Sequence, residues 1–223
     1  MTTTRHLEKN RTGLRERKKQ RTRQTVVDRA TQLFVDQGYG ETTLAEIAEA
    51  AEISPSTFFN YFASKSDIVF GLLDAAIESA RGRIVDRPAE ESASDAVLSW
   101  LTEEVPRVEQ PYTDAIRRIP GVIASVPELV AGNRLRYAIL EDMIATSFAR
   151  DLDEPPDGIR ARVMAAITMG AIGDVWRIWF EKHVNDAEFD PAQALPFKAA
   201  HVKAALDAAG RVIEVLPKPL LDI

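Results

Sequence analysis

The 223-residue sequence contains no cysteine, which excludes disulfide bonds and thiolate metal sites. Its three histidines, His6, His183 and His201, are too far apart in the chain to suggest a metal cluster or a catalytic triad. A glycine-rich phosphate loop and a nucleophile elbow are also missing. We therefore expect a protein that is not an enzyme and that uses neither a metal nor a cofactor.

Long uncharged stretches are missing as well. No run of about 18 residues lacks charged side chains, so no segment has the character of a membrane-spanning helix. The first residues are too polar for a secretion signal. Apolar residues make up 45% of the chain, which is enough to bury a core. We expect a folded, soluble protein of the cytoplasm.

Net positive charge is confined to the N-terminal part of the chain. The net charge is −6, yet residues 1–29 hold ten Lys or Arg against three acidic residues, a local balance of +7. A basic arm on an acidic chain favours a local contact with a polyanion such as nucleic acid. A merely solvated, disordered tail is the alternative. Within this arm, Arg21 and Arg23 are the candidate phosphate contacts.

The apolar pattern is helical throughout, and no alternation typical of a strand persists. Val26, Ala30 and Phe34 recur at helical spacing within residues 16–37, and Gly38 follows as the expected C-terminal stop. Proline and glycine divide the rest of the chain into apolar-striped helical segments. These are expected at about residues 66–83, 92–105, 112–119, 127–151, 158–183 and 191–216.

Two short helices are expected after the first one. Thr43 and Glu46 stand three positions apart, as in a capping box, and open the second helix. Ser54 can cap the third helix, where Pro55 suits the first position because no backbone donor is lost there. Two short helices joined by a tight turn, with a longer helix before them, form the helix-turn-helix plan. In that plan the second short helix enters the major groove of DNA.

An aromatic cluster marks the third helix. Phe58 and Phe62 are four positions apart and share one face, which we expect to point inward. Phe59, Tyr61 and the neighbouring hydroxyl and amide side chains would then face outward, where they can contact phosphates and base edges. Lys65, at the start of the next helix, could attract the same phosphate strand. The alternative is that these rings form only the core of a small bundle.

The stretch TTLAEIAEAAEISPSTFFNYFASKSDI, residues 42–68, resembles the DNA-binding domain of the TetR family of bacterial transcriptional regulators. The preceding stretch ATQLFVDQGYGETT, residues 30–43, resembles the upstream part of the same domain. Three residues depart from the family pattern. Glu52 replaces a turn glycine, so the turn either avoids a positive φ or accepts strain. Ser56 replaces a glycine, and Phe59 replaces a common tyrosine.

The resemblance implies an all-α protein with an N-terminal three-helix helix-turn-helix domain and a larger helical domain. A flexible basic tail (residues 1–14) would precede the DNA-binding domain (residues 15–70), and residues 71–223 would bind an effector and form a homodimer. It also implies a ligand-responsive regulator, commonly a repressor. Its dimer would bind a palindromic double-stranded DNA operator and be released by a small hydrophobic or amphipathic effector, with no membrane partner. A helical protein–protein interaction module without specific DNA binding is the alternative function.

The candidate site residues follow from these interpretations. The expected DNA-binding residues are Arg21, Arg23, Thr43, Ser54, Pro55, Ser56, Thr57, Phe59, Asn60, Tyr61 and Lys65. Aromatic and methionine side chains of the middle helices can line an apolar pocket, although most residues at such spacing are ordinary core. The expected ligand-binding residues are Trp100, Tyr137, Phe148, Met169, Asp174, Trp176 and Trp179. Small residues of the last two helices, such as Ala166 and Ala204, permit close packing either within the chain or across a dimer interface.

Overall fold

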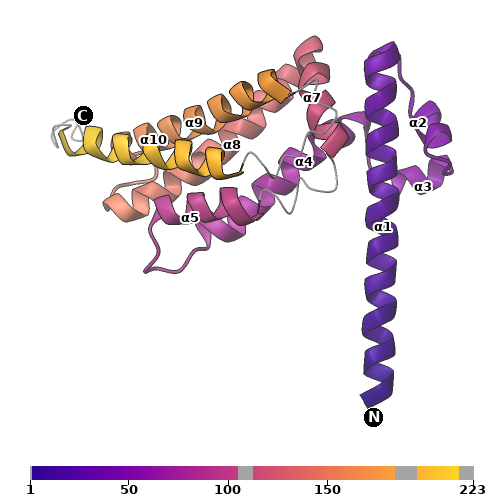
Figure 1. Cartoon of the computed structure of the whole chain (residues 1–223), viewed down its shortest axis with the longest axis horizontal. Coiled ribbons are helices and arrows are strands. Elements are labelled where there is room, and N and C mark those ends of the chain that lie inside the picture. Colours follow the sequence, from indigo (N-terminus) through magenta and orange to yellow (C-terminus); the bar gives the residue numbers. More distant parts are fainter. Residues whose placement is uncertain (1, 105–112, 184–194, 216–223) are drawn as a thin grey trace. The chain divides into compact units, whose positions relative to one another are not determined.

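The structure is a computed structural model of the chain, and it describes residues 2–104, 113–183 and 195–215. Over these ranges the chain is helical with connecting turns and has no β-strand, so the all-α expectation is confirmed (Figure 1). Its contacts form two compact units, one of Met1–Gly71 with Asp114–Leu129 and one of Leu72–Thr113 with Val130–Ile223. Among the described helices, none combines the length and apolar character needed to cross a membrane.

The first unit is built on helix α1, which spans Thr2–Gln37. The sequence favoured a helix only from residue 16 and a flexible tail over residues 1–14, whereas the structure carries the helix back to Thr2. Arg, Lys, Glu and Leu have high helix propensity, so this segment can continue the helix without an apolar stripe. At its other end α1 stops at the expected glycine, because Gly38 adopts φ +94°, a conformation without steric cost for that residue.

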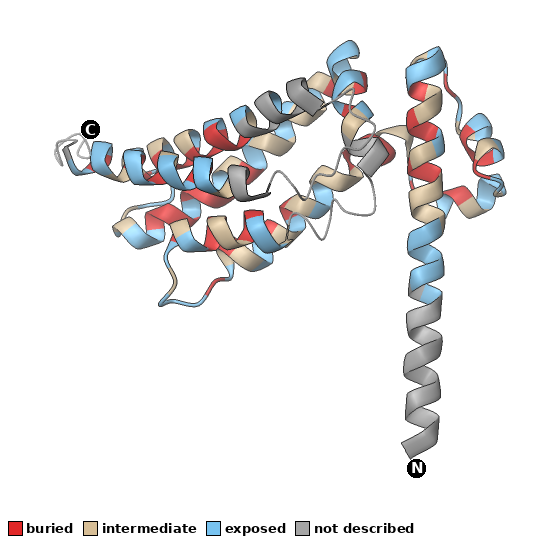
Figure 2. Cartoon of the chain, viewed as in Figure 1, coloured by how far each residue is buried: buried red, intermediate tan, exposed pale blue. Residues whose placement is uncertain are grey.

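Helices α2 (Leu44–Ala50) and α3 (Pro55–Phe59) lie beside the C-terminal half of α1 (Figure 1). The expected inward pair is confirmed, since Phe58 is 0% and Phe62 is 2% exposed, with ring centroids 5.7 Å apart. Figure 2 shows the matching buried positions on the part of α1 that faces these short helices. The other large buried residues of this core include Val26, Val27, Phe34, Tyr39, Ile47, Ile68 and Phe70.

The first unit also contains a segment from much later in the chain. Helix α7 (Thr113–Ser125) belongs to this unit, and its Arg118 guanidinium donates a hydrogen bond to the side-chain oxygen of Gln32 in α1. The apolar pattern predicted a helix that ends at residue 119, but in the structure the helix continues through Pro120 to Ser125. Proline removes a single helical donor, so it can distort a helix without ending it. Ile119 and Val122 of this helix are buried, as is Leu129 near the start of the next one.

The second unit is a bundle in which α5, α8, α9 and α10 lie alongside one another (Figure 1). Helix α4, which begins in the first unit, continues into it. The helical segments that contribute to the second unit are α4 (Lys65–Ala80), the π-helical turn η1 (Arg81–Val85), α5 (Ala93–Ser99), the π-helical turn η2 (Trp100–Glu104), α8 (Pro127–Leu152), α9 (Ile159–His183) and α10 (Leu195–Val215). These bounds lie close to the segments that the apolar pattern predicted. The core includes Ile84, Val97, Trp100, Ile144, Phe148, Ala165, Val202 and Leu206.

A buried arginine ties the loop before α5 to helix α8. Arg87 is only 5% exposed, and it donates to the backbone oxygens of Glu91 (2.9 Å) and Ser147 (3.0 Å). Its guanidinium also donates to the Ser147 hydroxyl and the Asp151 carboxylate. The second oxygen of Asp151 accepts from the backbone N–H of Ala93 (2.6 Å), the first residue of α5. A buried charge requires such a complete set of partners.

Replacing this arginine tests how much the network contributes to stability. Arg87→Met should lower the free energy of unfolding by about 3 kcal/mol, because carbonyl, hydroxyl and carboxylate partners lose their donor in a buried position. Urea unfolding followed by circular dichroism measures the change.

Arg162→Met is the matched control, because Arg162 pairs with Asp142 while both side chains are well exposed. Its effect should stay below about 1 kcal/mol. Equal losses in the two variants would show that burial does not strengthen the Arg87 network.

Candidate functional site

Helix α2 is fixed at its start by reciprocal hydrogen bonds between Thr43 and Glu46. The Thr43 hydroxyl accepts from the backbone N–H of Glu46 (3.2 Å), and the Glu46 carboxylate accepts from the backbone N–H of Thr43 (2.7 Å). The backbone bond from Thr43, followed by the bond from its hydroxyl, holds the pKa of Glu46 below its usual value. The predicted capping box is therefore confirmed, and Thr43 stands exposed at the N-terminus of α2.

Helix α3 has a cap in which three hydroxyl groups meet. The Ser54 hydroxyl accepts from the backbone N–H of Thr57 (3.1 Å), and it also lies 2.8 Å from the Thr57 hydroxyl and 2.9 Å from the Ser56 hydroxyl. Pro55 occupies the first turn, as predicted. The hydrogen bonds of Ser54 fix this end of the helix, and they hold the three hydroxyl groups close together on its outer side.

The outward face of α3 is polar with one prominent ring. Phe59 is 58% exposed and Asn60 is exposed, while Thr57 and Tyr61 are half-buried. The ring of Phe59 meets Phe58 edge-on, with centroids 5.6 Å apart. The aromatic cluster is therefore divided between a buried side and an open side. It does not form only a core.

The turn between α2 and α3 accepts a strained conformation. Glu52 has φ +55°, in the left-handed region that favours glycine. The turn is closed by hydrogen bonds from the backbone N–H of Glu52 to the oxygen of Glu49 (2.9 Å) and from that of Ile53 to Ala48 (2.9 Å). Of the two alternatives that the sequence left open at Glu52, the structure adopts strain, at a cost of about 1 kcal/mol.

Lys65 is directed toward the backbone of the turn after α1. Its ammonium donates to the carbonyl oxygens of Tyr39 (2.6 Å), Thr42 (2.8 Å) and Gly40 (3.3 Å), and it lies 4.6 Å from the centroid of the Tyr39 ring. An ammonium has three protons, and each has a carbonyl partner here. Lys65 therefore joins the start of α4 to the turn between α1 and α2.

The two candidate arginines of α1 have different surroundings. Arg21 is exposed, whereas Arg23 is half-buried and donates to the carbonyl oxygen of Tyr61 (3.1 Å) at the C-terminal end of α3. The guanidinium of Arg23 also lies 4.5 Å from the ring centroid of Phe62. The structure thus leaves Arg21 open to an external anion and turns Arg23 toward the helix-turn-helix.

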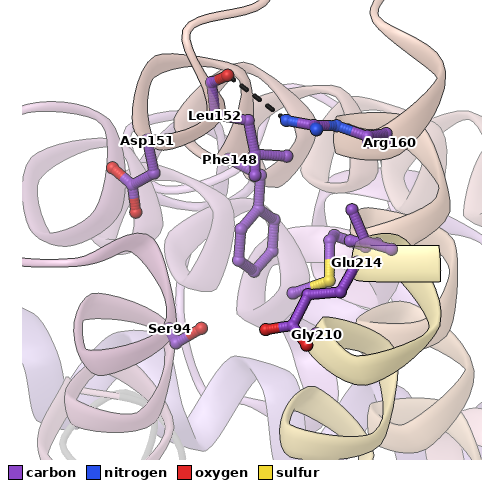
Figure 3. A pocket seen from close by; sticks show the side chains of 9 residues that line it. Ser94, Phe148, Asp151, Leu152, Arg160, Gly210 and Glu214 are labelled. Atoms are coloured by element: carbon purple, nitrogen blue, oxygen red, sulfur yellow. Dashed lines mark hydrogen bonds between the residues drawn. The ribbon is translucent and has the colours of Figure 1, made fainter. Parts of the chain in front are cut away.

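The second unit contains a cavity of about 490 Å³ (Figure 3). Figure 3 shows the Phe148 ring in its middle, with the carboxylates of Asp151 and Glu214 and the hydroxyl of Ser94 around it. Arg160 lies on one side, where it donates to the carbonyl oxygen of Leu152 (3.4 Å). The remaining lining residues are Met164, Gly210 and Ile213. An apolar wall with a few charged groups at its edge suits an amphipathic ligand.

The residues expected to bind a ligand are spread over several environments. Phe148 is the member of that set that lines this cavity. Trp100 and Met169 are buried in the core, and the Trp100 indole N–H donates to the Ser79 hydroxyl (2.9 Å). Tyr137 packs against the core, and Asp174 is exposed and pairs with Arg177 (3.1 Å). The side chains of Trp176 and Trp179 lie outside the described residues.

Sequence reasoning missed most of the residues that line the cavity. Ser94, Asp151, Arg160 and Glu214 come from four different helical segments, and none stands in a spacing pattern that indicates a shared site. Gly210 likewise stands in no such pattern. Only the packing of α5, α8, α9 and α10 brings these positions together.

Comparison with known proteins identifies both parts of the chain. Residues 26–72 match the family described as "Bacterial regulatory proteins, tetR family", and residues 88–195 match the one described as "MftR C-terminal domain". The chain is 30% identical to the HTH-type transcriptional regulator TcmR of Streptomyces glaucescens, over 84% of each protein. It is 26% identical to the biofilm operon HTH-type negative transcriptional regulator IcaR of Staphylococcus aureus, over 58% of this chain and 68% of that one.

A solved structure shows the same fold. The TetR family transcriptional regulator PfmR from Thermus thermophilus superposes with a TM-score of 0.51 over 82% of this chain and 97% of its own, at 15% identity. That likeness agrees with the helix order found here, and the sequence match to TcmR extends over most of both chains. The chain therefore belongs to the TetR family of DNA-binding bacterial transcriptional regulators.

Proposed function

We propose that this chain is a ligand-responsive repressor whose homodimer binds a palindromic operator and is released by a small hydrophobic or amphipathic effector. The single observation that carries the proposal is the two-sided helix α3. Its inner side is anchored by Phe58 and Phe62, and its outer side presents Phe59 and Asn60. A helix of this kind can enter a major groove without giving up its own packing.

The proposed DNA contacts divide by chemistry. Hydroxyl groups and the arginine of α1 suit phosphate oxygens, Asn60 suits a base edge, and the Phe59 ring suits a thymine methyl group. Half-buried Tyr61 and Thr57 border this face. The proposed direct contacts are Arg21, Thr43, Ser54, Pro55, Ser56, Thr57, Phe59, Asn60 and Tyr61.

Replacing the polar side chains of α3 tests the assignment. Thr57→Ala combined with Asn60→Ala should remove specific retention of an operator selected from a random duplex library by the unmodified protein. Each good base contact contributes about 1–3 kcal/mol, so the affinity should fall at least tenfold. A mobility shift assay at several salt concentrations measures it.

The matched control is Thr146→Ala with Asn133→Ala, which changes the same residue types on α8 in the second unit. This control should bind the operator as the unmodified protein does, and both double variants should keep the helical circular dichroism signal. Unchanged operator binding by the α3 variant would remove α3 from the interface. Failure to select any duplex would favour the alternative, a protein–protein interaction module.

The outer faces of α9 and α10 support the proposed homodimer. Ala166 and Gly170 on α9 and Ala204 and Ala208 on α10 are exposed, while Ala165 and Ala209 on the same helices are buried. Small residues on the exposed faces would let two copies pack their helices closely. A two-fold dimer would place two copies of α3 on a palindromic operator, whose half-sites share that symmetry.

Repression follows from occupancy of the operator. A dimer on a duplex excludes other proteins from the same site, and the similar protein IcaR is named a negative regulator. Release requires an effector with a higher affinity for a conformation that does not fit the operator. Helix α4 contributes residues to both units and is the proposed connection.

The cavity that contains Phe148 is the proposed effector site. Asp151 forms an ion pair with Arg87, and Arg160 forms one with Glu154. The carboxylate of Glu214 lines the cavity beside its apolar wall. The proposed ligand therefore has an apolar body and a polar or charged end.

Filling the cavity tests this site. Gly210 lines it, and a Cβ atom at that position would have no neighbour within 4 Å. Gly210→Leu should therefore fold and bind the operator normally. It should also lose at least tenfold in affinity for hydrophobic amines or acids that bind the unmodified protein in a thermal-shift screen.

Gly82→Leu is the control, because Gly82 is exposed in the same unit and away from the cavity lining, and its Cβ position is also open. This variant should respond to ligands as the unmodified protein does. Equal ligand responses in the Gly210 and Gly82 variants would place the effector elsewhere.

A further inference from the structure

Arg23 is the point at which three helices of the first unit meet. It stands on α1, it donates to the carbonyl oxygen of Tyr61 just after α3, and it lies against the α4 residue Gly71. We propose that Arg23 is a positioning residue that couples α4 to the C-terminal end of the recognition helix α3, and that it does not act as a phosphate contact. This inference rests on the proposed function, because the orientation of α3 matters only if α3 binds DNA.

The bond from Arg23 restrains α3 at its end. The carbonyl oxygen of Tyr61 accepts from Nη1 at 3.1 Å, just after the C-cap residue Asn60. A cation is favoured beside the carbonyl groups that follow a helix, because they carry a partial negative charge. The position of the guanidinium 4.5 Å from the Phe62 ring centroid adds a cation–π contact. Arg23 thus contacts both the backbone and the buried ring that fix this end of α3.

The space for the guanidinium depends on the missing side chain of Gly71. A Cβ atom at Gly71 would lie 2.9 Å from Nη2 of Arg23, closer than real Cβ contacts allow. Glycine is unfavourable inside a helix, but at this position within α4 (Lys65–Ala80) it leaves room for the guanidinium of Arg23. Gly71 is also the last residue of the first unit before the chain enters the second. A shift of α4 at this residue would therefore move Arg23 and, through it, the end of α3.

The neighbouring arginine provides the contrast. Arg21 is exposed and can neutralise a phosphate, whereas the guanidinium of half-buried Arg23 is held by the Tyr61 carbonyl and the Phe62 ring. The two roles differ in their salt dependence. When the logarithm of the DNA-binding constant is plotted against the logarithm of the salt concentration, loss of one phosphate contact makes the negative slope shallower by about 0.9. Loss of a positioning contact lowers the affinity and leaves the slope unchanged.

The sharpest test changes Gly71 and leaves the charge of Arg23 in place. Gly71→Ala should fold with an unchanged or higher melting temperature, because alanine favours the helix. It should nevertheless bind the selected operator about tenfold more weakly, because the guanidinium is displaced from Tyr61. Backbone amide shifts of residues 60–62, measured by NMR on the DNA-free protein, should change as well.

Gly121→Ala is the matched control, since Gly121 lies inside helix α7 of the same unit and a Cβ there would meet nothing within 4 Å. It should leave the affinity and the amide shifts of residues 60–62 unchanged. Arg23→Lys should reproduce the Gly71→Ala loss with the unmodified salt slope, because lysine keeps the charge without the planar guanidinium. The two changes combined should cost little more than either one alone.

Arg21→Gln completes the set, with an expected fall in salt slope of about 0.9 per contact. A reduced slope in Arg23→Gln that matches Arg21→Gln, or full affinity in Gly71→Ala, would overturn the proposal. If no duplex binds the unmodified protein, the proposed function fails. The NMR shifts then still decide whether Gly71 controls the position of Arg23, and unchanged shifts would reject the coupling itself.

Discussion

The helix-turn-helix depends on the burial of Phe58 and Phe62 beneath α3. This helix has five residues, far fewer than an isolated helix needs in water, so tertiary anchoring and caps must supply its stability. The two rings pack into the core of the first unit, and the Ser54 cap satisfies a backbone donor at the other end. Because the buried rings and the Ser54 cap hold this helix, Phe59 and Asn60 can remain exposed on its outer side.

Two basic side chains of this small domain donate hydrogen bonds to backbone carbonyl oxygens within it. Lys65 donates to three carbonyl oxygens after α1, and Arg23 donates to one carbonyl oxygen at the end of α3. Carbonyl groups that no helix or sheet satisfies are the natural partners of such cations. A count of positive charge therefore overstates the charge available to DNA. The exposed part of α1, with Arg21, remains the direct candidate for phosphate contact.

Local signals predicted the parts of this structure that local interactions determine. Four predictions depend on residues close together in sequence, and all four are confirmed: the capping box at Thr43, the cap at Ser54, the helix stop at Gly38 and the inward pair of rings. The inclusion of α7 in the first unit, the contact between Arg23 and Gly71, and the cavity around Phe148 join residues that are far apart in sequence. No periodicity encodes such contacts. Single-sequence reasoning therefore cannot assign partners to a glycine such as Gly71.

Helix α4 is the element through which the proposed effector would act on DNA binding. The helix contributes to the first unit up to Gly71 and to the second unit beyond it. If an effector favours one position of α4 and the operator favours another, each ligand must weaken the other by the same factor, because binding free energies are reciprocal. The coupling can be no larger than the difference in contacts that α4 makes in the two positions. On the DNA side, the contact that would sense this difference is the fit of the Arg23 guanidinium over Gly71, which a displacement comparable to one Cβ atom would disturb.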